Sequence, residues 1–141
     1  SDDKRMRYRA KQLLSRLEDF YGSLDTPQKE IIKQWIAKSS FNPATSYADR
    51  LRRQNDAIQT FTRISQSSSG SSASQAQLRG WLDRSLHPPE EVLHKYSLNL
   101  KQENCEGFAK LHNSTTRAQR ERLAENLLQY ENILHSLALK K

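Results

Sequence analysis

Four histidines and one cysteine are the side chains in this 141-residue chain that could bind a metal ion or attack a substrate. Glu90 and His94 lie one helical turn apart, and Cys105 and His112 lie two turns apart, so each pair could share one face of a helix. Zinc takes three or four ligands that converge on one point, and two separate pairs do not supply them. The sequence therefore predicts no metal site and places the histidines on the surface or half-buried. The histidines are His87, His94, His112 and His135.

Patterns for other catalysis are equally weak. A nucleophilic Cys105 would need a neighbouring base and an orienting group, which no local pattern supplies, so we expect a small buried side chain. The acidic pairs, Glu90 with Glu91 and Glu103 with Glu106, could suggest acid–base chemistry, but ordinary ion pairs with nearby lysines explain them better. The sequence contains no glycine-rich phosphate loop and no nucleophile elbow. It predicts a protein that is not an enzyme and uses no cofactor.

Three arginines on one segment are the best candidates for contact with an anionic partner. Arg50 and Arg53 are three residues apart and share a helix face, while Arg52 points elsewhere. Guanidinium groups can bind phosphate or carboxylate through two hydrogen bonds. The alternative is that these arginines form ion pairs within the protein, with acids such as Glu103 or Glu106. The sequence favours this alternative and leaves the anion site open.

The composition favours helices that could position such residues. Hydrophobic residues make up 35% of the chain and charged residues 28%, with four glycines and four prolines. This balance is typical of helices that keep a wide polar face, and the alternation expected of strands is missing. No apolar run approaches the roughly 18 residues that a membrane span needs. We expect one all-α domain over residues 1–141, an antiparallel bundle of five to six helices built around two helical hairpins.

Two stretches with nearly the same pattern mark the bends of these hairpins, GSLDTPQKE at residues 22–30 and NSTTRAQRE at residues 113–121. In the first stretch, Gly22 can adopt the left-handed conformation that ends a helix. Asp25 is a good N-cap for the next helix, and Pro27 is tolerated in its first turn. Gln28 can reach back to the backbone N–H of the cap. We expect a tight antiparallel turn here.

The second stretch repeats these roles 91 residues later. Asn113 is the other residue type that readily takes the left-handed closing position. Thr116 and Gln119 repeat the cap and its reciprocal partner. Each stretch therefore predicts the end of one helix, a short link and the capped start of the next. The residues expected to close or cap helices are Gly22, Asp25, Gln28, Asn113, Thr116 and Gln119.

Apolar side chains at helical spacing predict which faces turn inward. A closing helix carries five leucines that we expect to share an interior with Trp35; they are Leu123, Leu127, Leu128, Leu134 and Leu137. A helix after the Asn-Pro turn at residues 42–43 carries four more side chains expected to face inward, namely Tyr47, Leu51, Ile58 and Phe61. Between them, the serine-rich stretch SQSSSGSSASQ at residues 65–75 predicts a flexible loop.

Three segments together resemble the C-terminal region of an uncharacterised family of proteobacterial lipoproteins. They are LSRLEDFYGSLDTPQKEIIKQWIAKS at residues 14–39, YADRLRRQNDAIQTF at residues 47–61, and NLKQENCEGFAKLHNSTTRAQRERLAENLLQYENILHSLA at residues 99–138. The likeness lies in their order: a Gln-centred turn, a tryptophan, an arginine-rich helix and a second Gln-centred turn before a closing helix. The two turns are also loosely similar to those of small periplasmic helical stress chaperones.

The resemblance implies the C-terminal part of a longer lipoprotein, held on the periplasmic side of the cell envelope by a lipid anchor outside these residues. It also implies a non-enzymatic helical domain that binds an unidentified protein partner, in a chaperone-like way. The formal net charge of +7 keeps a basic nucleic-acid-binding module open as the alternative. Aromatic residues do not alternate with basic ones as in single-strand binders, so the sequence favours the protein-binding domain. Weak attachment to anionic lipid through basic residues 4–11 is a third interpretation.

Overall fold

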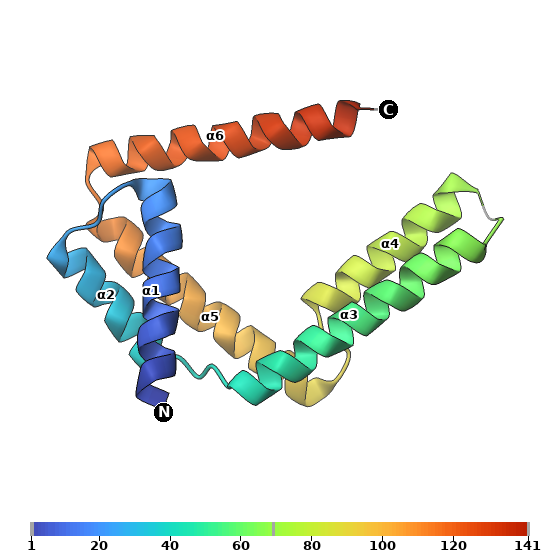
Figure 1. Cartoon of the computed structure of the whole chain (residues 1–141), viewed down its shortest axis with the longest axis horizontal. Helices are drawn as coiled ribbons and strands as arrows, with labels where there is room; N and C mark the ends of the chain where they lie inside the picture. Colours follow the sequence, from blue (N-terminus) through green and yellow to red (C-terminus); the bar gives the residue numbers. More distant parts are fainter. Residues whose placement is uncertain (1, 69, 141) are drawn as a thin grey trace. The chain divides into compact units, whose positions relative to one another are not determined.

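The computed structural model describes residues 2–68 and 70–140, and within them the fold is entirely helical (Figure 1). The helices are α1 (Asp2–Tyr21), α2 (Thr26–Lys38), α3 (Pro43–Gln66), α4 (Ser71–Leu86), α5 (Glu91–Ser114) and α6 (Arg117–Leu139). The predicted all-α fold with six helices is confirmed. Among the described residues, no helix combines the length and the apolar character that crossing a bilayer requires.

The chain divides into two compact units, where the sequence predicts a single domain. Unit 1 comprises residues 1–39 and 103–141, and unit 2 comprises residues 40–102. Helix α5 contributes its first half to unit 2 and its second half to unit 1. The division follows the helix pairing, because α1 packs against α2 and α6, whereas α3 packs against α4.

The first repeated turn has the predicted geometry. Gly22 adopts a φ of 80° and its N–H donates to the Glu18 carbonyl at 2.8 Å, which ends α1. The Asp25 carboxylate accepts from the Gln28 N–H at 2.8 Å, and the Asp25 N–H donates to Gln28 Oε1 at 3.0 Å. This reciprocal capping box satisfies backbone donors that the helix itself cannot pair.

The second turn keeps the predicted cap but not the predicted helix end. Thr116 Oγ1 accepts from the Gln119 N–H at 3.2 Å, and the Thr116 N–H donates to Gln119 Oε1 at 2.9 Å. The left-handed conformation expected of Asn113 is wrong, since no described residue other than a glycine has a positive φ. Helix α5 instead continues to Ser114. The hydroxyl groups of Ser114 and Thr115 donate to the Leu111 and His112 carbonyls, each at 2.6 Å, so the last carbonyls are satisfied without a left-handed residue.

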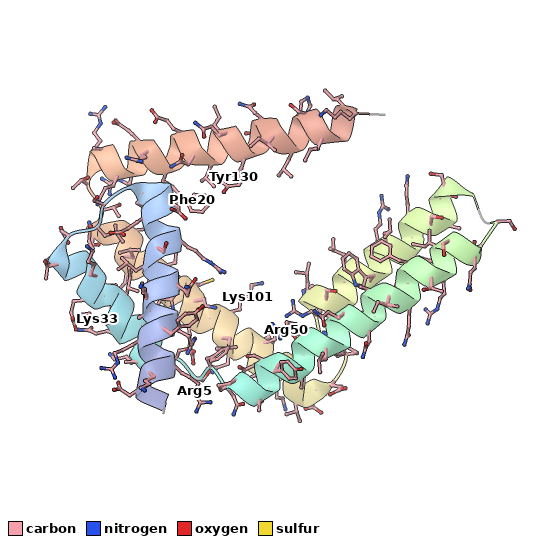
Figure 2. All side chains as sticks on the ribbon, in the orientation of Figure 1. Arg5, Phe20, Lys33, Arg50, Lys101 and Tyr130 are labelled. Atoms are coloured by element: carbon pink, nitrogen blue, oxygen red, sulfur yellow. The ribbon has the colours of Figure 1, made fainter. Side chains whose placement is uncertain are left out.

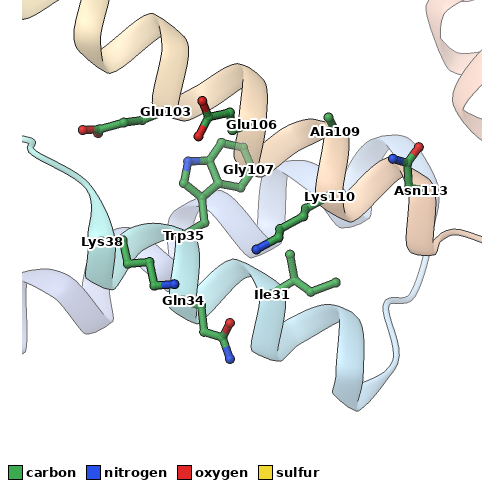
Figure 3. A pocket seen from close by; sticks show the side chains of 10 residues that line it. All are labelled: Ile31, Gln34, Trp35, Lys38, Glu103, Glu106, Gly107, Ala109, Lys110 and Asn113. Carbon is green, nitrogen blue, oxygen red and sulfur yellow. The ribbon is translucent and has the colours of Figure 1, made fainter.

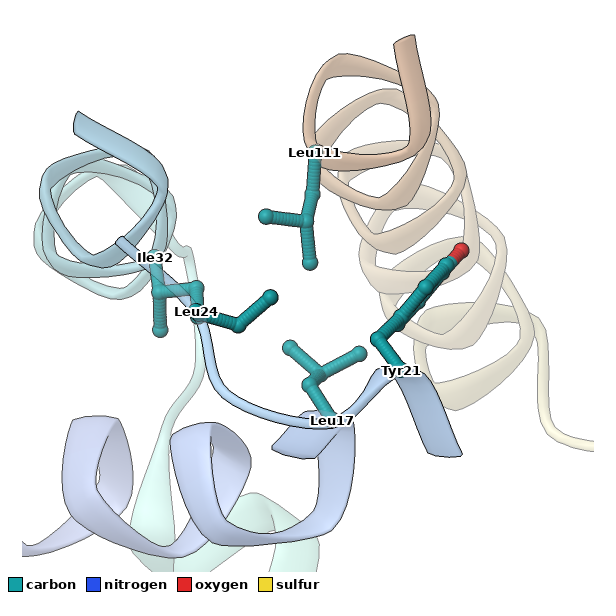
Figure 4. Close-up of a cluster of buried hydrophobic side chains, with 5 residues drawn as sticks. All are labelled: Leu17, Tyr21, Leu24, Ile32 and Leu111. Atoms are coloured by element: carbon teal, nitrogen blue, oxygen red, sulfur yellow. The ribbon is translucent and has the colours of Figure 1, made fainter. Parts of the chain in front are cut away.

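The core of unit 1 lies where α1, α2 and the end of α5 meet (Figure 4). Its buried side chains are Leu17, Tyr21, Leu24, Ile32 and Leu111. Trp35 and Leu123 pack partly against this cluster. The core therefore unites segments at opposite ends of the sequence.

The other leucines of α6 are exposed, so the expectation that they share an interior with Trp35 is wrong. Leu127, Leu128, Leu134 and Leu137 are between 52% and 66% exposed. Helix α6 crosses the end of α1, where Asn126 donates to the Phe20 carbonyl at 2.8 Å and the rings of Phe20 and Tyr130 stack 5.5 Å apart (Figure 2). A crossing contacts only a short length of a helix, which leaves the second half of α6 without cover.

Unit 2 is built on the α3–α4 hairpin, whose helices are joined by charged and polar groups. Asn42 caps α3 by accepting from the Thr45 N–H at 3.0 Å. Arg84 of α4 binds the carboxylate of Asp56 through two hydrogen bonds, of 3.0 and 2.8 Å. Its guanidinium also lies 3.3 Å from the hydroxyl of Thr60, which is buried. The hydrogen bond from Arg84 lowers the pKa of Asp56, and the same bond raises the pKa of Arg84.

Two further expectations fail in unit 2. Helix α3 extends to Gln66 and α4 begins at Ser71, so much of the serine-rich segment 65–75 is helical rather than a loop; residue 69 lies outside the described residues. The side chains predicted to face inward on α3 are exposed: Tyr47, Leu51, Ile58 and Phe61. They are displaced from the interior because Asp56 and Thr60 occupy the face that meets α4.

Candidate functional site

Gln28 and Gln119 join the two repeated turns directly, side chain to side chain. Gln28 Nε2 donates to Gln119 Oε1 at 2.9 Å and to the Ser114 carbonyl at 3.1 Å. Gln119 Nε2 donates to Gln28 Oε1 at 3.0 Å and to the Ser23 carbonyl at 2.9 Å. Each Oε1 also accepts from its own cap N–H. Both amides therefore use both donors and accept two hydrogen bonds, which leaves the pair fully satisfied.

Other residues that lie 91 positions apart also meet beside the Gln28–Gln119 pair. Tyr21 and His112 occupy equivalent positions, and the Tyr21 hydroxyl lies 2.7 Å from His112 Nδ1. Leu24 and Thr115 are a second equivalent pair, and both are buried. Burial raises the pKa of the Tyr21 hydroxyl. The repeat thus builds an approximately two-fold interlock between the α1–α2 and α5–α6 turns, which is a scaffold rather than a reaction centre.

A groove lies between α2 and the second half of α5 on unit 1 (Figure 3). It has a volume of about 590 Å³ and is bordered by Trp35 and Ile31, with two lysines and two glutamates around them. Trp35 Nε1 donates to Asn104 Oδ1 at 3.2 Å, which fixes the indole along the α5 backbone. Trp35 is half-buried, so the expectation that it is an interior anchor holds for one side of the ring only.

Gly107 makes this position of Trp35 possible. A Cβ atom at residue 107 would lie 2.2 Å from Cδ2 of the indole, far inside van der Waals contact. The helix tolerates glycine here because the ring fills the space that a side chain would take. A glycine within a helical segment was the available signal for this close approach, and sequence reasoning missed it.

Two of the three candidate arginines share one carboxylate of their own helix. Arg52 and Arg53 both bind Asp49, at 2.8 and 3.0 Å, and Arg52 also donates to the Arg84 carbonyl at 3.1 Å. The Arg50 guanidinium lies 5.2 Å from the ring centroid of Tyr47. Arg52 is therefore part of the hairpin framework, while Arg50 and the half-exposed Arg53 lie at the surface.

An apolar surface on unit 2 lies beside these arginines, and we call it the hairpin face. The α3 side chains of this surface recur on one side of their helix, and those of α4 recur one turn apart. The ring of Phe61 lies 5.6 Å from that of Trp81, which joins the two stripes. The hairpin face consists of Leu51, Ile58, Phe61, Leu78 and Leu82, each at least 37% exposed.

The remaining candidates are the histidines and Cys105. No three His, Cys, Asp or Glu side chains within residues 2–68 and 70–140 converge closely enough to hold a metal ion. Cys105 is exposed, so the expected burial of this residue is wrong. His87 pairs with Asp83 at 3.0 Å in the next turn of the same helix.

Comparison with known protein families, curated proteins and solved structures finds no match for this chain. The functional proposal therefore depends on the chemistry of the surfaces described above and on the resemblance of the capped turns.

Proposed function

We propose that this chain is a non-enzymatic helical domain that binds amphipathic helices of protein partners at the hairpin face. The observation that carries this proposal is the exposure of five large apolar side chains along two adjacent helices. Contiguous apolar surface of this kind marks interaction sites in soluble domains. An amphipathic helix that lies along two others is a recurring mode of peptide recognition.

The energetics of the hairpin favour an outside occupant. The α3–α4 interface includes the Arg84–Asp56 pair, Thr60 and the contact of Phe61 with Trp81, and the side chains of the hairpin face still keep at least 37% of their surface exposed. Burying one such side chain fully would contribute about 1.5–3 kcal/mol. A partner helix that covered the hairpin face would therefore gain favourable binding free energy.

The charges around the hairpin face select the kind of helix. Helices α3 and α4 together carry six arginines and three aspartates. Asp49 is shared by Arg52 and Arg53, and Asp56 is held by Arg84. Arg50 and Arg79 directly adjoin Leu51 and Leu78 in the sequence. A helix with leucines on one side and glutamates along its flanks would match both the apolar surface and the positive charge.

The first experiment measures binding to two designed amphipathic peptides by fluorescence anisotropy. Both peptides carry the same leucine stripe, and their flanks are glutamate in one and lysine in the other. We expect the glutamate peptide to bind more tightly, and Ile58→Glu to weaken binding by at least about tenfold, since a charge would then face an apolar stripe.

Gln59→Glu is the matched control, because it adds the same charge to an exposed polar position of the same helix that is turned about 100° away from Ile58. Equal affinity for the two peptides would contradict the electrostatic part of the proposal. An unchanged affinity in Ile58→Glu would reject the hairpin face as the binding site.

We also propose that the protein lies on the periplasmic side of the cell envelope, which the resemblance to envelope lipoproteins supports. On the periplasmic side, a domain of this kind would bind exposed apolar helices of other envelope proteins in a chaperone-like way. Fractionation of cells that make the natural full-length protein tests this point. We expect it in the membrane fraction, released by detergent but not by salt; recovery in the cytosol would reject the envelope location.

Nucleic acid remains the alternative partner, and the six arginines of α3 and α4 are the observation in its favour. Phosphate binding by several arginines would make affinity fall steeply with salt. A titration with duplex and single-stranded DNA at low salt distinguishes the two. Salt-sensitive binding that Arg50→Gln weakens and Ile58→Glu leaves unchanged would favour the nucleic-acid alternative.

A further inference from the structure

Helix α6 carries a second apolar stripe, on unit 1, that the proposed function does not use. The stripe advances by alternating steps of four and three residues, which is the spacing of helices that pair side by side. Its members are Leu123, Leu127, Tyr130, Leu134 and Leu137, and we call it the α6 seam. Ile133 lies next to the seam and is also exposed.

The seam is anchored at one end and uncovered at the other. Leu123 packs against the core cluster of unit 1, and Tyr130 stacks on Phe20. Leu134 and Leu137 lie beyond this crossing and are 66% and 59% exposed. The helix thus holds its apolar residues in helical register where the rest of unit 1 does not bury them.

We propose that the α6 seam of one copy packs against the α6 seam of a second copy, so that the protein forms a homodimer. A second copy fits better than a charged partner, because residues 126–139 contain Glu131 and His135 as their two ionisable side chains other than Tyr130 and include no lysine, arginine or aspartate. A stripe with so few charges is matched by another such stripe. In a two-fold dimer the same surface serves both subunits, so the seam residues beyond the α1 crossing, Leu134 and Leu137, would find apolar counterparts.

The available area predicts a weak dimer. A large apolar side chain has roughly 100 Å² of surface to bury. Five side chains of the seam and its edge are more than half exposed, namely Leu127, Tyr130, Ile133, Leu134 and Leu137, and together they would bury on the order of 300 Å² in each copy. Standard stable interfaces bury about 800 Å² per partner, so the dimer should dissociate on dilution.

The packing of unit 1 also indicates the direction of pairing. The first half of α6 is occupied by its contacts with α1, whereas the second half is free. Antiparallel pairing of the second halves places the two copies of the α1–α2 hairpin at opposite ends of the pair. Parallel pairing would place both of these hairpins at the same end, beside each other.

Sedimentation equilibrium over a wide range of protein concentration tests the proposal, with a reducing agent present because Cys105 is exposed. We expect a reversible monomer–dimer equilibrium. Leu134→Glu should raise the dissociation constant by about a hundredfold, since both subunits then place a carboxylate in the seam. Leu137→Gln, which adds no charge, should raise it by about tenfold.

Asn132→Glu is the matched control, because residue 132 lies on the opposite side of the same helix and is exposed. It should leave the dissociation constant unchanged, and circular dichroism should show equal helicity in all variants. A monomer at every concentration would overturn the proposal, and so would equal weakening by Leu134→Glu and Asn132→Glu. Ile58→Glu should weaken peptide binding by at least about tenfold without changing the dimer, so the two proposals fail independently.

Discussion

The two units solve the same problem, joining antiparallel helices, in opposite ways. Unit 1 surrounds a neutral polar pair, Gln28 with Gln119, by an apolar core. Unit 2 places a charged pair, Arg84 with Asp56, between its helices and leaves the apolar side chains outside. A neutral and fully satisfied pair can be buried at small cost, whereas a charged pair keeps access to water. The comparison teaches that a polar contact fixes which helices pair without covering the apolar side chains on their outer faces, which stay exposed on α3 and α4 in unit 2 and on the second half of α6 in unit 1.

The largest effect is expected where the interlock of unit 1 is broken. Gln28→Ala leaves the Ser114 carbonyl and the Asp25 N–H without their side-chain partner and removes two hydrogen bonds of the Gln119 amide. We expect unfolding free energy to fall by about 2–3 kcal/mol, as measured by urea denaturation. The double variant with Gln119→Ala should cost less than the sum of the single changes, because each removes the same contact. Strict additivity would show that the two amides act independently.

The next effect concerns the close approach of Trp35 to α5. Gly107→Ala forces a methyl group into the indole and should destabilise unit 1 by about 2 kcal/mol. Gly80→Ala in unit 2 is the control, since its Cβ would meet only the end of the Arg84 side chain, at 3.2 Å. We expect Gly80→Ala to be neutral or slightly stabilising because alanine favours helix. Hydrogen exchange of α2 and α5 amides would report the difference, and equal protection in both variants would contradict it.

The charged pair of unit 2 should make its stability depend on pH. The pKa of Asp56 is lowered in the folded state, so its contribution is present above the unfolded value of 3.8 and is lost as the pH falls through the lower folded value. Asp56→Asn should cost about 1 kcal/mol near neutral pH, a modest figure because Arg84 is partly exposed. It should also flatten the acid limb of the stability curve for α3 and α4. An unchanged acid limb would mean that the pair is not coupled to folding.

The smallest effects are expected at the two caps. Asp25→Ala and Thr116→Ala each remove one side-chain acceptor and should each cost about 1 kcal/mol. Both variants keep the paired glutamines, so their costs should be similar and much smaller than that of Gln28→Ala. Thermal unfolding followed by circular dichroism measures both. A loss at either cap as large as the loss in Gln28→Ala would mean that capping, rather than the interlock, holds unit 1 together.

The local parts of the fold were predictable from the sequence. Gly22 and the capping boxes at Asp25 and Thr116 were found because each uses donors and acceptors within a few residues of one another. Asn113 was predicted wrongly for a similarly local reason. The hydroxyl groups of Ser114 and Thr115 satisfy the end of α5, and two motifs competing for the same carbonyls cannot be ranked by residue type alone.

The candidate surfaces were much less predictable. Apolar spacing identified Ile58 and Leu134 as members of apolar helix faces. Whether these faces are exposed depends on whether another helix packs against them. The three arginines were recognised as a group, yet Asp49, one turn away, was not recognised as their shared partner. Gly107 and Trp35 lie far apart in the sequence and meet only because α2 packs along α5.

The sequence by itself determined where α1 ends and where α2, α3 and α6 begin, because capping acts within one turn of the chain. It also determined which residues form apolar stripes, since the helical period alone sets those faces. Only the tertiary structure decided that the two repeated turns bind each other through Gln28 and Gln119, and that the stripes of α3 and α6 stay exposed. A side chain is buried only when a second segment packs against it. That segment lies far away in the sequence, so no local pattern specifies it.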